Sequence, residues 1–387
     1  NNIISNITTG SSLYGISFSG LNASVYNNNI YGLSSTTTGS NVVIGISTAS
    51  ITNNTTNLNI YNNFISDIKA PGSTSFVGTT GINAVSGTNV NIFYNTVFLK
   101  FTSTNAVNKS TALSLGDTSP DMVDIRDNIF VNLTDVTNGQ NAFAVRKAGT
   151  WLLNLASTCN NNLYYAGVPS SKNLIFYDGT NADSTLLQYK NRVSPRESNS
   201  VTENPPFVNS LTTPFNLHLN TGIATQVESG GTPVTSPIAI TTDYDGNTRN
   251  ATTPDIGADE FNGIATDLAS PIIVYNPLLN TSSTSTRTLV ASITDPGSGV
   301  PTTAPGWPNL YWKKNTGGSW TAVIPSGVVA GIYSFNFGSG VSLNDTVYYY
   351  IVAQDLASTP NVGVFPSTGA GGFTSNPPAA SIPPTPP

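Results

Sequence analysis

The first half of the chain repeats one short pattern, in which apolar residues flank a central asparagine. The stretch "LNIYNNFISDI" occupies residues 58–68. Near-copies are "VYNNNIYGL" at 25–33, "VNIFYNTVFLKF" at 90–101, "VDIRDNIFVNL" at 123–133 and "TCNNNLYYA" at 158–166. One copy recurs about every 30 residues, which is a spacing typical of repeat architectures.

A second series of apolar segments lies between these copies. Its members are "GISFS" at 15–19, "GISTA" at 45–49, "GINAV" at 81–85, "TALSL" at 111–115 and "NAFAV" at 141–145. Both series alternate apolar and polar residues, are rich in Ile, Val, Phe and Tyr, and lack the period of a helix. Each unit therefore predicts at least two short strands joined by Gly, Ser, Thr and Asn turns.

A unit of such short strands cannot bury its own apolar face, whereas units stacked in register can. The pattern therefore predicts an all-β protein whose residues 1–167 form a right-handed parallel β-helix, a solenoid of about five to six coils. A β-propeller would require four strands in each unit. The β-helix is favoured because the repeats do not comfortably supply four strands.

The recurring asparagine is predicted to serve shape and not chemistry. Asparagine tolerates left-handed backbone angles and hydrogen-bonds within its own turn. Its amide is both donor and acceptor, so asparagines at one place in successive coils would stack as a ladder along the solenoid. The alignment assigns these residues to the ladder: Asn29, Asn63, Asn95, Asn128 and Asn162. Ile60, in the strand before Asn63, is expected to point inward.

The repeats resemble those of secreted bacterial proteins with parallel β-helix coils, including the Bacteroidetes type. The resemblance covers about half of the chain. Lyases, hydrolases, adhesins and phage spikes share such a scaffold, so the resemblance implies a fold and not an activity. The opening "NNIISNI" matches only the second half of a coil. We therefore expect either further coils before Asn1 or another molecule against this end of the solenoid.

Residues 168–263 interrupt the repeats with charges and prolines. Their segments "DYDGNTR" and "DIGADEF" resemble the region that closes many Bacteroidetes β-helices, where D-x-D-G-x-x-R and D-I-G-A-x-E motifs recur. Charged and proline-rich sequence suits an atypical unit that caps the last coil. We expect a structural salt bridge between Arg249 and one of its acidic neighbours, Asp255, Asp259 or Glu260.

Residues 264–375 contain strand-like segments at roughly 10-residue spacing, which predicts a β-sandwich of about seven strands. The segments "SITD" and "DTVYYYI" resemble immunoglobulin-like or fibronectin-like modules. Without a cysteine pair, Trp312 or Trp320 and Tyr349 are expected to supply the large core side chains. The tail 376–387 is typical of a polyproline II linker. In the proteins that the chain resembles, such a linker leads to a domain for type IX secretion and anchoring.

Charge is scarce along the chain. Only 9% of its 387 residues are charged and the net charge is −6, whereas roughly 25% are charged in an average soluble protein. No basic cluster suits a phosphate backbone, so no nucleic-acid partner is expected. No apolar run approaches membrane-spanning length, so no membrane insertion is expected. Cys159 is the only cysteine, which excludes an intrachain disulfide.

One cluster of charged residues could carry catalysis, in and after the segment "DTSPDMVDIRDN". Its members are Asp121, Asp124, Arg126, Asp127 and, one coil later, Arg146. A polysaccharide lyase would use acidic calcium ligands and a basic side chain on adjacent coils, and a glycosidase would use two carboxylates. The alternative is a solvated turn whose charges neutralise one another. We favour the turn, because no neighbouring coil continues the acidic stripe.

A calcium site is the only cofactor hypothesis. Asp243, Asp245 and Asn247 have the first spacings of a calcium loop, but the later glycine and glutamate of such a loop are missing. A tight turn is the favoured alternative. The sole histidine, His218, alternates with apolar residues and is expected at the surface. A catalytic triad and a zinc site are therefore poorly supported.

Together these features favour a non-enzymatic extracellular protein of the cell surface. A rigid β-helix rod with an immunoglobulin-like module would act in adhesion or as a subunit of a larger surface assembly or filament. Its expected partners are further copies of itself, other cell-surface proteins or polysaccharide. The alternative is a carbohydrate-active enzyme, namely a polysaccharide lyase or glycoside hydrolase, or a carbohydrate-binding protein that uses the β-helix face.

Overall fold

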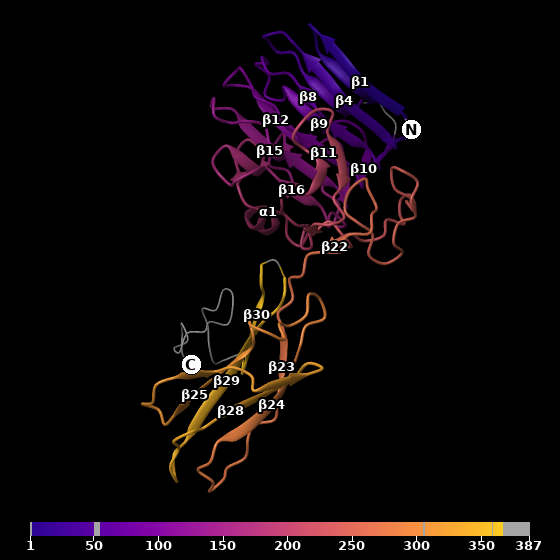
Figure 1. Cartoon of the computed structure of the whole chain (residues 1–387). Helices are drawn as coiled ribbons and strands as arrows, with labels where there is room; N and C mark the ends of the chain where they lie inside the picture. Colours follow the sequence, from indigo (N-terminus) through magenta and orange to yellow (C-terminus); the bar gives the residue numbers. More distant parts are fainter. Residues whose placement is uncertain (1, 50–54, 305, 358, 367–387) are drawn as a thin grey trace. The chain divides into compact units, whose positions relative to one another are not determined.

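The computed structural model describes residues 2–49, 55–304, 306–357 and 359–366. The chain divides into two compact units, Asn1–Ala265 and Thr266–Pro387. Unit 1 contains the repeats together with the segment that follows them (Figure 1). The predicted linker 376–387 lies outside the described residues.

Unit 1 is a parallel β-solenoid of about five turns, which confirms the predicted all-β class and the solenoid. Its strands form three parallel sheets, named A, B and C here. Sheet A contains β1 (Asn2–Thr9), β4 (Asn28–Ser35), β7 (Phe64–Ser66), β11 (Thr96–Leu99), β14 (Ile129–Asn132) and β16 (Leu163–Tyr165), with β8 (Ile68–Lys69) beside β4. Sheet B contains β2 (Leu13–Phe18), β5 (Val43–Thr48), β9 (Thr79–Ala84), β12 (Lys109–Leu115), β15 (Asn141–Lys147) and β17 (Asn173–Tyr177), with β18 (Ala182–Asp183) antiparallel at its edge. Sheet C contains β3 (Asn22–Tyr26), β6 (Asn57–Tyr61), β10 (Asn89–Phe93) and β13 (Met122–Arg126).

Successive coils stack in register, so like residues form columns. Ile60 pairs with Ile92, and Ile92 with Ile125, and all three side chains are buried in the solenoid core. The residues that alternate with them along each strand point to the outer face of sheet C, where one column contains Ser24, Asn59, Asn91 and Asp124. Ile60 points inward as predicted.

Sheet A differs because both of its faces are covered. In β11, Val97 and Leu99 belong to the solenoid core, whereas Phe98 packs into a second core on the outer face. A strand buried on both faces reads as a continuous apolar run, as in "VFL" at 97–99 of β11.

The segment after the repeats has two structural roles. Its first part caps the last coil through the single helix of the described residues, α1 (Leu186–Val193). Tyr189 of this helix is buried and stacks on Phe176 of the last coil at 4.9 Å. Thr185 and Gln188 form a capping box at the start of the helix, which stabilises its first turn.

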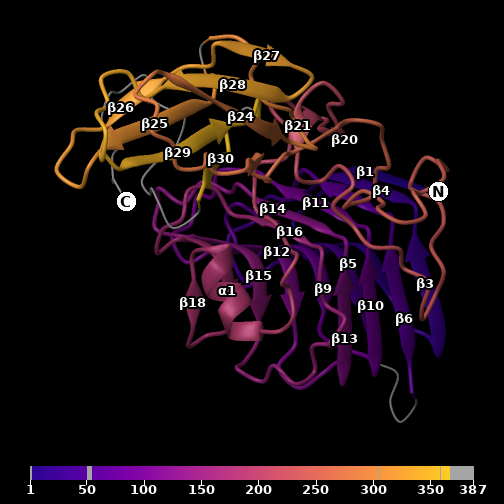
Figure 2. The same cartoon turned by 90° about the horizontal axis from the view of Figure 1, so that it is seen from below.

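The second part runs back along the solenoid and covers the outer face of sheet A. Its strands are β19 (Phe207–Asn209), β20 (Asn216–Leu219), β21 (Ala224–Thr225) and β22 (Ile264–Ala265). Leu217 and Ile256 pack against Phe98 and Ile129 of sheet A, and Figure 2 shows β20 and β21 on this side of the solenoid. Only the first part of residues 168–263 therefore closes the end of the solenoid, and the rest supports its side.

Unit 2 contains two four-stranded antiparallel sheets. One has the order β23 (Ile272–Val274), β24 (Arg287–Thr294), β28 (Ile332–Phe337), β27 (Gly327–Val329), and the other the order β26 (Thr321–Val323), β25 (Asn309–Lys314), β29 (Val347–Gln354), β30 (Val362–Phe365). Both contribute to one core, for example through Leu289 and Phe335 of the first sheet and Leu310 and Ile351 of the second. Assignment of this unit to an immunoglobulin-like family remains a prediction. No helix in the described ranges is long and apolar enough to cross a membrane.

Candidate functional site

The recurring asparagine forms a continuous amide ladder inside the solenoid. Along it, each Nδ2 donates to the Oδ1 of the next coil at 2.9–3.0 Å. The members are Asn2, Asn28, Asn63, Asn95, Asn128 and Asn162. From Asn63 to Asn162, each Oδ1 also accepts a main-chain N–H, as when Asn95 N donates to Asn128 Oδ1 at 2.9 Å. The ladder therefore satisfies the backbone at a bend where sheet hydrogen bonds are interrupted.

One predicted member of the ladder is wrong. Asn28 occupies the ladder, whereas Asn29 pairs in register with Phe64 and lies half-buried on the other face of β4. The triplet "NNN" at 27–29 allows either alignment, and only strand pairing selects between them. At the far end, Glu197 accepts from Asn162 Nδ2 at 3.1 Å and Ser200 Oγ accepts from Asn162 N, so the cap completes the ladder.

The residues before the five ladder asparagines from Asn28 onward form a second row, which points outward. These residues have left-handed backbone angles, with φ between 50° and 58°. They are Asn27, Asn62, Tyr94, Asp127 and Asn161. In four of them the side chain holds the segment 226–261, which we call the strap. Their partners are Thr242 for Asn62, Thr232 for both Tyr94 and Asp127, and Gly230 for Asn161.

Within this outward row, Asp127 has a strongly raised pKa. Its side chain is fully buried, Oδ1 accepts from Thr232 N at 2.9 Å, and Oδ2 has no hydrogen-bond partner. Burial raises the pKa of Asp127 to about 8, although the Thr232 hydrogen bond and Arg126 and Arg249 act in the opposite direction. The carboxyl group is therefore held in a buried contact between coil and strap.

The five residues of the predicted catalytic cluster do not form one site. Asp124 and Arg126 make an ion pair at 2.8 Å on β13, and the Arg126 guanidinium lies 4.5 Å from the Phe93 ring. Asp121 is exposed before β13, and Asp127 is buried under the strap. Arg146 lies on β15 of sheet B, whereas the others lie on or next to sheet C. The sequence spacing suggested that Arg146 joins the cluster. In the structure β14 of sheet A lies between β13 and β15 along the chain, so Arg146 lies on a different sheet from Asp124.

Arg249 anchors the strap against the solenoid. Its guanidinium donates to Asn62 Oδ1 at 3.0 Å and to Gly257 O at 2.9 Å, and it lies 3.8 Å from the Tyr94 ring centroid. Its carboxylate partner is Glu260, at 3.2 Å. Asp255 contacts Arg249 only through its main-chain carbonyl, and its own carboxylate accepts from backbone N–H groups.

The predicted calcium loop is a hydrogen-bonded turn. Asp243 is buried and accepts from the backbone N–H groups of Asn247 and Glu260 at 2.7 and 2.9 Å. Asp245 instead faces His218, with 2.8 Å between its Oδ2 and the Nε2 of the histidine. The two aspartates therefore serve different contacts. His218 is half-exposed, as the sequence predicted for a surface position.

Two other groups of three metal-type ligands lie within 4.8 Å of one another. They are His218 with Asp245 and Asp259, and Asp267 with Asp295 and Asp355. In both groups carboxylates already accept hydrogen bonds from backbone N–H groups. Asp259, for example, accepts from Leu219 N at 2.9 Å, and Asp355 from Asn361 N at 2.9 Å. These contacts explain the clusters as loop-stabilising groups.

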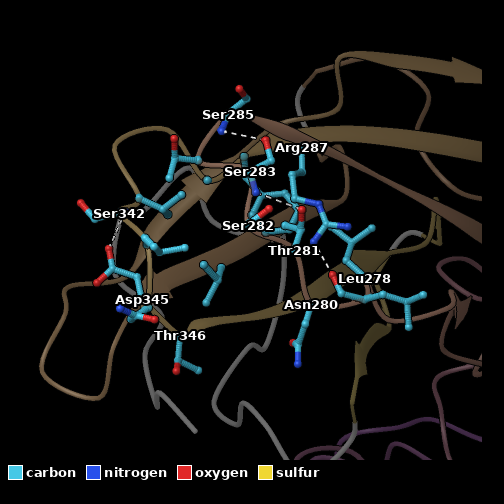
Figure 3. Close-up of a pocket in the computed structure, with 18 of the residues that line it drawn as sticks. Leu278, Asn280, Thr281, Ser282, Ser283, Ser285, Arg287, Ser342, Asp345 and Thr346 are labelled. Carbon is cyan, nitrogen blue, oxygen red and sulfur yellow. Dashed lines mark hydrogen bonds between the residues drawn. The ribbon is translucent and has the colours of Figure 1, made fainter.

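A hollow of about 440 Å³ lies in unit 2, between loops at 278–287 and 337–349 (Figure 3). Hydroxyl groups dominate its walls, and its only charged lining residues are Arg287 and Asp345. Arg287 donates to Leu279 O at 2.7 Å, and Asp345 accepts from Ser342 N at 2.8 Å. The hollow therefore lacks a free acid–base pair.

A second hollow, of about 480 Å³, lies along the strap and contains Glu228, Asp255 and Glu260. Burial raises the pKa of Asp255 to about 7. Its carboxylate accepts from Ser229 N at 2.6 Å and Phe261 N at 2.8 Å, and so serves the turn. In the same hollow the Ser229 hydroxyl donates to Glu228 Oε1 at 3.0 Å, and Glu228 Oε2 accepts from Gly263 N at 2.7 Å, so this carboxylate also holds the backbone just after the strap.

The sequence matches no protein-family profile, and comparison with curated proteins and with solved structures also returned no match. The resemblance to secreted Bacteroidetes proteins therefore remains an expectation. The assignment of a function depends on the contacts above.

Proposed function

We propose that this chain is a non-enzymatic structural or adhesive protein of the cell exterior. In this proposal unit 1 is a rigid supporting solenoid, and unit 2 is an immunoglobulin-like module. Copies of the chain, or other cell-surface proteins, would build it into a larger surface assembly.

One observation carries the proposal: the candidate groups at sheet C and under the strap, apart from the exposed Asp121, are already used to hold the solenoid and its strap together. Asp124 and Arg126 pair with each other, Asp127 and Tyr94 bind Thr232, and Arg249 binds Glu260. A catalytic acid or base must instead reach the proton that it transfers. Binding and support need no such freedom.

The surface also suits association between copies. The outer face of sheet C carries an exposed row in which Asn89 donates to Asn57 and Asn57 donates to Asn22, each at 2.9 Å. These groups are uncharged, so a second copy approaching them meets little electrostatic repulsion.

The proposal is tested by incubating the full chain with a panel of polysaccharides, with and without calcium, and by sizing the products. We expect every polymer to keep its length. Cleavage of any polymer at an enzyme-like rate, abolished by Asp124→Ala, would overturn the proposal. Negative-stain microscopy at rising concentration tests assembly, and dispersed monomers at every concentration would contradict self-association.

A further inference from the structure

A group of cations and aromatic rings lies on the outer face of sheet B, far in sequence from the strap. We call it the cationic–aromatic cluster. Its members are Phe76, Lys109, Phe143, Arg146, Lys172 and Tyr177. Lys109 begins β12, Phe143 and Arg146 lie on β15, and Tyr177 ends β17, so three paired strands supply most of it. Figure 2 labels two of them, β12 and β15.

The rings form a layered platform. Phe143 is buried and stacks on Tyr177, with 5.0 Å between centroids and 6° between planes. Phe76 comes from the loop before β9, lies 6.0 Å from Tyr177, and remains 38% exposed. This loop is fixed, because Ser73 Oγ donates to Asn41 O at 2.6 Å. The platform is therefore a built surface with an aromatic ring open to solvent.

Two cations lie against the same exposed ring. Lys109 Nζ is 4.0 Å from the Phe76 centroid, and the Arg146 guanidinium carbon is 4.8 Å from it. Burial, followed by repulsion from Lys172 and Arg146, lowers the pKa of Lys109. Burial also lowers the pKa of Arg146, and its Nε is buried without a hydrogen-bond partner.

No carboxylate balances these charges within the described part of the chain. Several other basic residues of unit 1 do have a carboxylate partner, for example Arg126 with Asp124 and Arg192 with Asp183. The chain is acidic overall, yet Lys109, Arg146 and Lys172 gather without an acid. Like charges that are held together and partly desolvated destabilise a fold. A bound anion would relieve this repulsion, so the arrangement favours an anionic ligand.

We propose that the cationic–aromatic cluster binds an acidic saccharide, one that carries carboxylate or sulfate groups. The Arg146 side chain, which is half-buried, would receive the anion at the part of its guanidinium that faces solvent, with Lys109 and Lys172 adding charge. The exposed ring of Phe76 would contact the apolar face of the sugar. The proposal rests on the proposed adhesive function, to which it adds a ligand class.

Two features favour a saccharide over a peptide or a nucleic acid. The strands β12 and β15 are paired on both sides, so they offer no free edge to which an extended peptide could add. Three cations on a chain of net charge −6 are few for a nucleic acid, whose affinity comes from many phosphate contacts.

The test is isothermal titration of the full chain with three probes: a polygalacturonate oligosaccharide, dextran sulfate and neutral dextran. We expect one or both anionic probes to bind, with affinity that falls as salt rises, and neutral dextran not to bind. Arg146→Gln and Lys109→Gln should each weaken binding about 10-fold or more, as expected for loss of a charge-assisted hydrogen bond. Phe76→Ala should weaken binding without changing its salt dependence.

The matched control is Lys190→Gln, which removes one positive charge on the helix α1, where Lys190 donates to Ser198 O at 3.0 Å. It should bind like the parent chain. Lys172→Gln supplies a second, more peripheral test if Arg146→Gln proves unstable in thermal melts. Absence of binding to both anions, or equal binding by the Arg146→Gln and Lys190→Gln variants, would overturn the proposal. Product sizing separates the two proposals: binding with cleavage contradicts the non-enzymatic function, whereas intact polymer without binding contradicts only this site.

Discussion

At the scale of single residues, the two asparagines of the pair Asn62–Asn63 have different structural roles. In "YNNF", Asn62 adopts the left-handed conformation and points to the strap, while Asn63 turns inward to the ladder. Asparagine is suited to both, because it tolerates a positive φ and its amide donates and accepts. The same left-handed position holds Tyr94 and Asp127 in other coils, so the ladder residue is the invariant element of the motif within this chain.

Asn63→Leu should lower the thermal stability of unit 1. The Asn63 side chain is fully buried and donates to Val25 O, Tyr61 O and Asn95 Oδ1. Leucine would leave several of these acceptors unsatisfied, so we expect a loss of about 3 kcal/mol or more, at ~1–3 kcal/mol for each buried polar group. Circular dichroism melts measure the loss. Asn57→Leu, at an exposed position of β6, is the matched control and should change stability by less than ~0.5 kcal/mol.

Asp127→Asn should stabilise unit 1, and the gain should grow with pH. Because the folded pKa of about 8 lies above the ordinary value of 3.8, the folded state retains a proton that the unfolded state loses. Stability from this group is therefore highest below pH 4 and declines as pH rises towards 8. Asparagine already fills the same position at Asn62 and Asn161, so it fits the backbone.

Denaturant titrations between pH 4 and 9 test this prediction. At the alkaline end, the free energy of unfolding of the Asp127→Asn variant should exceed that of the parent by at least ~1 kcal/mol, since one unit of pKa shift corresponds to about 1.4 kcal/mol. Asp121→Asn removes the same charge at an exposed position and should not change the pH profile. If the Asp127→Asn variant lost stability with rising pH as steeply as the parent does, the role assigned to the buried carboxyl group would be contradicted.

At the scale of elements, sheet A is stabilised from both sides, by the solenoid core within and by residues 205–261 outside. Gly257 shows how closely the strap approaches. Its φ is +98°, and a Cβ at this position would lie 2.6 Å from Ile129 Cδ1. The glycine of "DIGADEF" is therefore required by both backbone conformation and contact with β14.

Arg249→Met should release the strap while the coils stay folded. The substitution keeps an apolar side chain against Tyr94 but removes the hydrogen bonds to Asn62, Gly257 and Glu260. We expect a local loss of about 3 kcal/mol, because Glu260 is left without its buried partner. Limited proteolysis with mass spectrometry should show faster cleavage within residues 226–261.

Arg287→Met is the matched control for this experiment. Arg287 lies in unit 2 and donates to the carbonyl of Leu279. Its variant should leave cleavage of the strap unchanged. Equal protection of the strap in the Arg249→Met variant and the parent would show that the outer core, and not Arg249, holds this segment.

At the scale of the whole molecule, the two units have separate cores and should unfold as separate transitions. Trp307, Trp312 and Trp320 lie in unit 2, whereas Trp151 is 49% exposed in unit 1. Tryptophan fluorescence therefore reports mainly on unit 2, and circular dichroism on both units. In the Asn63→Leu variant, the transition seen by fluorescence should stay unchanged while an earlier transition appears by circular dichroism. A common shift of both signals would show that the units unfold together.

The sequence by itself determined the solenoid of unit 1. Apolar residues at alternating positions, repeated about every 30 residues, can be buried only when units stack, and a buried asparagine in each unit then meets its copies. The continuous apolar runs in β11 and β14 also contained a signal for a strand covered on both faces, which the prediction of an end cap did not use.

Tertiary structure alone decided where the chemistry-bearing residues meet. Strand pairing placed Asn28, and not Asn29, in the amide ladder. The three-sheet coil placed Arg146 on sheet B and Asp124 on sheet C. Arg249 reaches Asn62 across 187 positions of the chain. Local spacing cannot encode such contacts, because they depend on how far the closing segment folds back and on which face it covers. The repeat therefore specifies the scaffold, and long-range packing specifies which side chains remain free to bind.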